Sequence, residues 1–144
     1  MNEAFRCVGI TESERQEVIR SLSVCLWLGN LAFCEKRAEV AEVQDRQVLD
    51  IIAGLLQVPS ASLESALCNR QIQTGIGAKA EKFTKPQTAS GADFSRDTLA
   101  KAIYTRLFDY LVGKINASIR KDNFQGIQIG VLDIYGFEIF QYNR

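Results

Sequence analysis

An apolar run near the C-terminal end is followed by two carboxylates and a glycine, a pattern suited to phosphate chemistry. The β-branched run 127–134 is typical of a strand buried on both faces. Asp133 lies at its end, Gly136 follows three residues later, and Glu138 comes next but one. A carboxylate there can hold a hydrated magnesium ion, and a glycine amide can approach a nucleotide phosphate closely. From spacing alone, a purely structural strand, turn and capped helix remains the alternative.

Two long helices are predicted ahead of this segment in the sequence. Thr11 and Glu14 form a capping box that begins a helix over 12–29, with apolar residues nearly all round it. A second, longer helix is predicted over 95–120, where apolar residues recur every four positions. Both patterns predict deeply buried helices.

Two shorter helices are predicted between them, after a charged stretch over 35–42 that indicates a surface loop or short strand. One covers 45–57 and begins near Asp45, and the other covers 60–68 with Ser60 as its cap.

The segment 70–94 has a different pattern. Apolar and polar residues alternate around Ile72, glycines and a proline interrupt the run, and lysines charge it. An exposed, hairpin-like loop is the expected structure.

Composition excludes several classes of function. The 17 basic and 17 acidic side chains balance, which argues against nonspecific nucleic-acid binding. No apolar run is long enough to span a membrane. The chain has no histidine, which removes Ser–His and Cys–His nucleophiles. Its four cysteines lack paired spacing, and the N-terminus lacks the order of a secretion signal, so free buried thiols in the cytoplasm are expected.

The string from Val131 to Asn143, VLDIYGFEIFQYN, resembles switch II of the myosin motor domain. Other segments match the same family in its own order. They are LWLGNLAF (26–33, with Trp27 where the family commonly has histidine), RQIQTG (70–75), DTLAKAIY (97–104) and RLFDYLV (106–112).

The resemblance implies a role for each residue of the C-terminal string. Asp133 would hold Mg²⁺ through water, and the amide of Gly136 would sense the γ-phosphate of ATP. Glu138 would pair with an arginine of switch I and close the pocket around the attacking water. Residues 127–138 are then the switch II strand and loop, and 139–144 begin the relay helix. The implied chemistry is phosphoryl transfer from ATP to water.

The resemblance also assigns 70–94 to a loop that contacts actin. The family usually places an acidic or phosphorylatable residue sixteen positions before the aspartate matched by Asp97, and that position is Glu81. Lys79 and Lys82 flank it. Without the resemblance, a solvated loop of mixed charge is the simpler interpretation.

The sequence contains no G-x-x-x-x-G-K-[ST] phosphate loop and no switch I string. We therefore expect an internal piece of a myosin head, inactive alone, that contacts light chains or calmodulin only through other regions. The expected fold is a helix-dominated, mixed α/β fragment of this P-loop NTPase-type motor, with one central-sheet strand and a peripheral β-hairpin. Deprived of its sheet neighbours, that strand would leave its apolar faces poorly covered. The alternatives are a non-catalytic helical module that binds actin or another protein, and a stand-alone phosphate-binding domain.

Overall fold

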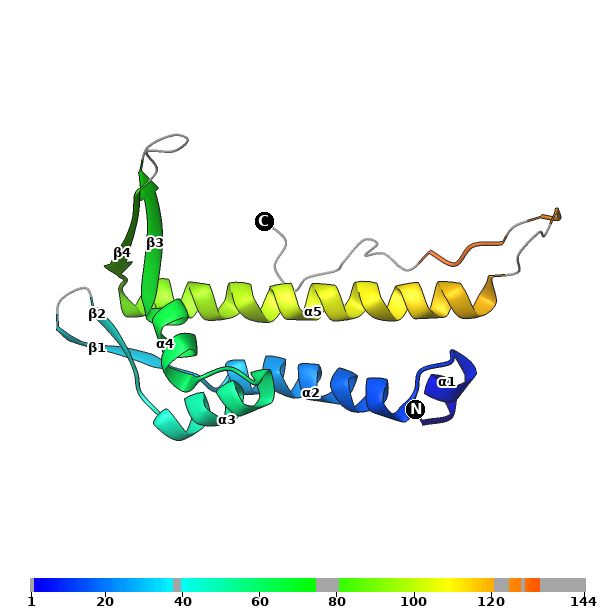
Figure 1. Ribbon diagram of the computed structural model, residues 1–144, viewed down its shortest axis with the longest axis horizontal. Coiled ribbons are helices and arrows are strands. Elements are labelled where there is room, and N and C mark those ends of the chain that lie inside the picture. Colours follow the sequence, from blue (N-terminus) through cyan, green and yellow to red (C-terminus); the bar gives the residue numbers. More distant parts are fainter. Residues whose placement is uncertain (1, 38–39, 75–80, 121–124, 128, 133–144) are drawn as a thin grey trace, which may run out of the picture.

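The computed structural model describes residues 2–37, 40–74, 81–120, 125–127 and 129–132. Helices predominate in this part of the chain, with two small antiparallel sheets beside them (Figure 1). The elements are α1 (Asn2–Cys7), α2 (Glu12–Leu28), β1 (Phe33–Arg37), β2 (Val40–Val43), α3 (Arg46–Leu56), α4 (Ser60–Cys68), β3 (Asn69–Thr74), β4 (Glu81–Pro86) and α5 (Ala89–Ile119). The predicted mixed, helix-dominated class is confirmed.

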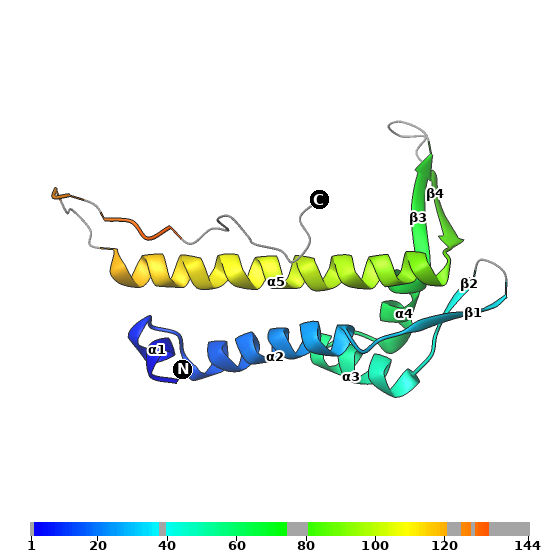
Figure 2. The same cartoon turned by 180° about the vertical axis from the view of Figure 1, so that it is seen from behind.

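Helix α2 begins at the predicted capping box and runs alongside α5 in both views (Figure 2). The Thr11 hydroxyl accepts a hydrogen bond from the Glu14 amide at 3.3 Å, and the Glu14 carboxylate accepts one from the Thr11 amide at 2.9 Å. The expected all-round burial is wrong, however. Val24 and Leu28 are buried, whereas Leu26 is 75% exposed. Because α3 and α5 cover only part of its circumference, the remaining apolar side chains face outward.

The hydrophobic core lies at one end of the molecule, between α2, α3, α4, the sheet β1–β2 and the start of α5. The strands of this sheet, predicted only as a loop or short strand, contribute Phe33, Ala41 and Val43 to it. The buried members are Val24, Leu28, Leu31, Phe33, Ala41, Val43, Leu49, Ile52, Ala53, Leu63, Leu67, Cys68 and Ala92.

The caps of the two short helices differ from one another. Helix α3 begins beside Asp45 as predicted, and Asp45 caps it, because its carboxylate accepts a hydrogen bond from the Gln47 amide at 2.8 Å. The predicted cap by Ser60 is wrong. Pro59 occupies the cap position, without a side-chain bond, and the Ser60 hydroxyl instead donates to Asp50 at 2.6 Å.

Helix α5 begins at Ala89, earlier than predicted. The Thr88 hydroxyl accepts a hydrogen bond from the Gly91 amide at 3.2 Å, and Ala92 is completely buried against the core. The expected burial of the whole helix is wrong, since Ala92 is its one buried residue. A stripe of apolar side chains along the second half is exposed: Tyr104, Phe108, Val112, Ile115 and Ile119.

The predicted central-sheet strand does not form among residues 127 and 129–132. Their apolar side chains are in solvent, with Val131 97% exposed. The expectation of a buried strand is therefore wrong for these residues. The expectation that the apolar side chains of this run would be uncovered is confirmed for Ile127, Ile129, Val131 and Leu132, which are 80–97% exposed.

All four cysteines are free thiols. Cys68 is buried, and burial raises its pKa to about 11, but Cys7 is exposed, contrary to the expectation of buried thiols. Among the described residues no single helix is long and apolar enough to cross a membrane; α3 and α4 reach the required length only as a pair, which is bent by 108°.

Candidate functional site

The predicted nucleotide-site residues Asp133, Gly136 and Glu138 lie outside the described residues. Within the described ranges, no group of three or more carboxylate, thiol or imidazole side chains could hold a metal ion. The Mg²⁺ assignment thus depends on the sequence around Asp133.

The second predicted site, the segment 70–94, contains the predicted hairpin. Strands β3 and β4 pair in regular antiparallel register from Asn69 opposite Pro86 to Thr74 opposite Glu81. Glu81 and Lys82 are the first two residues of β4, opposite Thr74 and Gln73, whereas Lys79 lies outside the described residues. The hairpin stands out from the start of α5, on the side away from α2 (Figures 1 and 2).

Gln87 fixes the hairpin to the body. The backbone N–H of Gln87 donates a hydrogen bond to the Cys68 carbonyl at 3.1 Å. Its backbone carbonyl accepts a hydrogen bond from the backbone N–H of Ala41 at 2.8 Å. Its side-chain amide donates to the Leu67 carbonyl and, at 3.0 Å, to the Ser95 hydroxyl. One residue thus ties the foot of the hairpin to α4, β2 and α5. Sequence reasoning missed this role, because nothing local distinguishes Gln87 from an ordinary loop glutamine.

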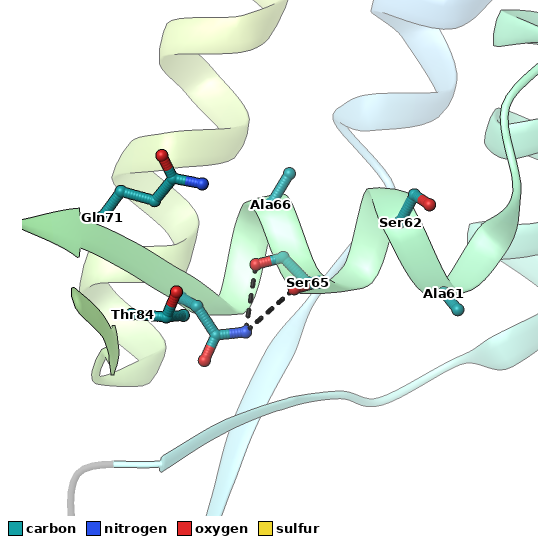
Figure 3. A pocket seen from close by; sticks show the side chains of 7 residues that line it. Ala61, Ser62, Ser65, Ala66, Gln71 and Thr84 are labelled. Atoms are coloured by element: carbon teal, nitrogen blue, oxygen red, sulfur yellow. Dashed lines mark hydrogen bonds between the residues drawn. The ribbon is translucent and has the colours of Figure 1, made fainter. Parts of the chain in front are cut away.

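One face of the hairpin turns toward α4. A cavity of about 610 Å³ separates them, and the Asn69 side chain bridges its edge by donating to the Ser65 carbonyl at 3.0 Å (Figure 3). The lining is small and mostly polar, with no ionisable side chain. It consists of Ala61, Ser62, Ser65, Ala66, Asn69, Gln71 and Thr84. The hydroxyl and amide groups that line this cavity can form hydrogen bonds, but none of the lining side chains is a catalytic acid or base.

A charged cluster joins the two long helices at the opposite end from the core. The Glu14 carboxylate accepts hydrogen bonds from Lys114 Nζ at 2.6 Å and from the Tyr110 hydroxyl at 2.9 Å. The bond from Lys114, followed by those from Thr11, lowers the Glu14 pKa to about 2. The hydrogen bond to Glu14 in turn raises the pKa of Lys114. We call Glu14, Tyr110 and Lys114 the clasp. The sequence predicted the capping role of Glu14 but not the clasp, since Lys114 is 100 positions away.

The comparisons with known proteins agree with the motifs. The profile of the myosin head (motor domain) family matches residues 1–144, so the chain belongs to the myosin head family.

Its relatives include two heavy chains of Dictyostelium discoideum and one fungal protein. Myosin ID heavy chain is 43% identical over 98% of this chain, and myosin IA heavy chain 45% over 97%. Myosin-3 of Candida glabrata is 42% identical over 97%. The matches cover 13%, 14% and 11% of these relatives, respectively, so the chain corresponds to a small part of each.

Proposed function

We propose that this chain is the part of an ATP-driven, actin-based motor that senses the γ-phosphate and carries one actin contact. The observation that best supports this proposal is the family match. It covers residues 1–144 and so includes both the Asp133–Glu138 string and the hairpin. Because the chain spans about one-seventh or less of the relatives' length, the remaining parts of the nucleotide pocket belong to other regions.

Each residue of the string has a distinct proposed role. Asp133 holds Mg²⁺ through a water molecule, as a single carboxylate suits that hydrated cation. Gly136 presents its amide to the terminal phosphate, where no side chain obstructs the approach. Glu138 pairs with an arginine from another part of the motor and encloses the attacking water. Bound MgATP supplies the phosphoanhydride and the charge-neutralising cation, and the chain supplies positioning.

The proposed actin contact comprises Glu81 and Lys82, the first residues of β4, together with Lys79, which precedes them in the sequence. Its support is the family match together with a strand pair that extends away from both long helices. Glu81 provides a permanent negative charge where the family commonly has an acidic or phosphorylatable residue.

A chimera tests the nucleotide role. Residues 1–144 replace the matching segment in the motor domain of Dictyostelium myosin ID heavy chain, and phosphate release is measured with and without actin filaments. We expect Glu138→Ala and Gly136→Ala to slow release by about a hundredfold, as losses of preorganised groups do. Asp122→Ala, a nearby carboxylate outside the string, is the control. Equal rates in all four proteins would refute the role.

The isolated chain should not hydrolyse ATP, because its sequence holds no phosphate-cradling lysine motif. The measurement is steady phosphate release by the purified 144-residue chain against a buffer control. Release above that control, abolished by Asp133→Ala, would contradict this prediction.

A further inference from the structure

The clasp joins α5 to α2 close to the point where α5 ends. Lys114 lies about one and a half turns before Ile119, the last residue of the helix. The chain that leads to the Asp133–Glu138 string leaves α5 at this end. Because a helix is stiff, a contact that fixes its last turns also fixes where the following segment begins.

Apolar packing between the two helices is incomplete beside the clasp. A cavity of about 310 Å³ lies there, lined by Glu14, Glu17, Val18, Ser21, Leu107 and Tyr110. Val18 is buried, whereas Leu107 is only partly so. A gap of this kind forfeits the close contacts by which packed side chains fix one helix on another. The polar bonds of the clasp therefore define much of the register of α5 on α2 at this end.

The carboxylate of Glu14 is bonded on both sides. Its Oε2 accepts hydrogen bonds from the backbone N–H and the hydroxyl of Thr11, both at 2.9 Å. Its Oε1 accepts the bonds from Tyr110 and Lys114. Lys114 Nζ also lies 5.7 Å from the centre of the Tyr110 ring, within the range of a cation–π contact. The cap of α2 thus orients the carboxylate, which presents one oxygen to α5.

Stability alone does not account for this arrangement. The side chains of Glu14 and Lys114 are 31% and 32% exposed, and ion pairs this open to water add little to stability. Bonds of fixed geometry can nevertheless select one register of two packed elements over its neighbours. Tyr110 and Lys114 lie one turn apart on α5, so sliding the helix by a turn, about 5.4 Å, would break both bonds.

We propose that Glu14, Tyr110 and Lys114 are positioning residues for the γ-phosphate-sensing string. Their action is indirect. They hold α5 in one register on α2, so that the segment after Ile119 starts from a fixed place. The inference rests on the proposed function, because it takes Asp133–Glu138 as the segment that meets the phosphate.

The test uses the myosin ID chimera described above, with phosphate release and hydrogen–deuterium exchange as readouts. Lys114→Met removes the ammonium group and should lower kcat by about tenfold, since small misplacements of reacting groups are costly. Tyr110→Phe removes only the hydroxyl and should lower kcat by about threefold. KM for ATP should stay within about twofold of the wild-type value, because binding precedes the step that is impaired. Amide exchange in peptides covering 125–138 should become about fivefold faster in Lys114→Met.

Two further variants separate positioning from general damage to the helix. Lys114→Arg retains a charged donor for Glu14 and should restore kcat to within about twofold of the wild type. Lys101→Met makes the same chemical change at an exposed position in the first half of α5, and should leave both readouts unchanged. Melting followed by circular dichroism verifies that each variant is folded; where Lys114→Met is not, Tyr110→Phe carries the test.

The outcomes distinguish this inference from the proposed function. Slower release and faster exchange in the clasp variants, with Lys101→Met unchanged and Glu138→Ala also slow, support both. Release that Glu138→Ala slows but neither clasp variant slows overturns the positioning role and leaves the proposed function standing. The same holds if Lys101→Met slows release as much as Lys114→Met. Release that Glu138→Ala does not slow overturns the proposed function and, with it, this inference.

Discussion

Apolar residues at the two ends of α5 differ in their surroundings. At the first end Ala92 is completely buried against the core formed by α2, α3, α4 and the sheet β1–β2. At the second end Phe108 and Ile115 repeat with helical spacing and remain exposed. Helical periodicity identifies the apolar face of a helix. It does not tell whether the same chain supplies the covering element.

The two ends also differ in what holds them. Backbone and side-chain bonds of Gln87, together with the core, secure the first end. At the second end the Glu14 carboxylate accepts hydrogen bonds from Tyr110 and Lys114 near the surface. Stability should therefore depend strongly on the first end and weakly on the second. Three pairs of substitutions test this, in order of expected size.

The largest effect is expected from Leu49→Ala in the core. Leu49 is fully buried, so its truncation should lower the free energy of unfolding by about 2–5 kcal/mol. Phe108→Ala, at the uncovered end of α5, should change it by less than about 0.5 kcal/mol. Urea unfolding measures both. Similar losses in the two variants would show that the stripe on α5 is covered in solution.

An intermediate effect is expected from Gln87→Ala. It removes the side-chain bonds to Leu67 and Ser95 and leaves the Leu67 carbonyl without that donor. The loss should be about 1–3 kcal/mol. Gln71→Ala, an exposed glutamine on the same hairpin, is the matched control and should be nearly neutral. An unchanged unfolding midpoint for Gln87→Ala would mean that the hairpin is held in another way.

The smallest effect is expected at the clasp, and it depends on pH. The folded pKa of Glu14, about 2, lies below its ordinary value of 4.5. Its stabilising contribution is therefore fully present above about pH 4.5 and is lost as the pH falls toward 2. Melting temperatures of the wild type and Glu14→Gln should differ at pH 6 and converge near pH 2. A constant difference across this range would contradict the clasp, and Glu12→Gln controls for acidic residues of the same turn.

Local chemistry made much of the fold predictable. The capping box at Thr11, the cap at Asp45 and the hairpin all follow from rules that act within a few residues. The early start of α5 was missed because Gly91 lowers helix propensity, whereas burial of Ala92 compensates through tertiary packing. The sheet β1–β2 was predicted only as a surface loop or short strand, because charged residues interrupt its apolar pattern.

The candidate site likewise has features that the sequence predicts and features that it does not. The family match covers Asp133, Gly136 and Glu138, but their arrangement lies beyond the described residues. The hairpin was predictable from alternation and glycines. Its attachment through Gln87 and the clasp at Glu14 were not, because both join residues that are distant along the chain and come together only after packing.

The continuity of α5 has a mechanical consequence. It is a single helix of 31 residues, and at about 1.5 Å per residue it measures roughly 46 Å. Such a rod curves only gently. It keeps a fixed spacing between the root of the hairpin and Ile119. A push on the hairpin is therefore delivered to the far end as tilt or sliding of the entire rod, without being absorbed along the way.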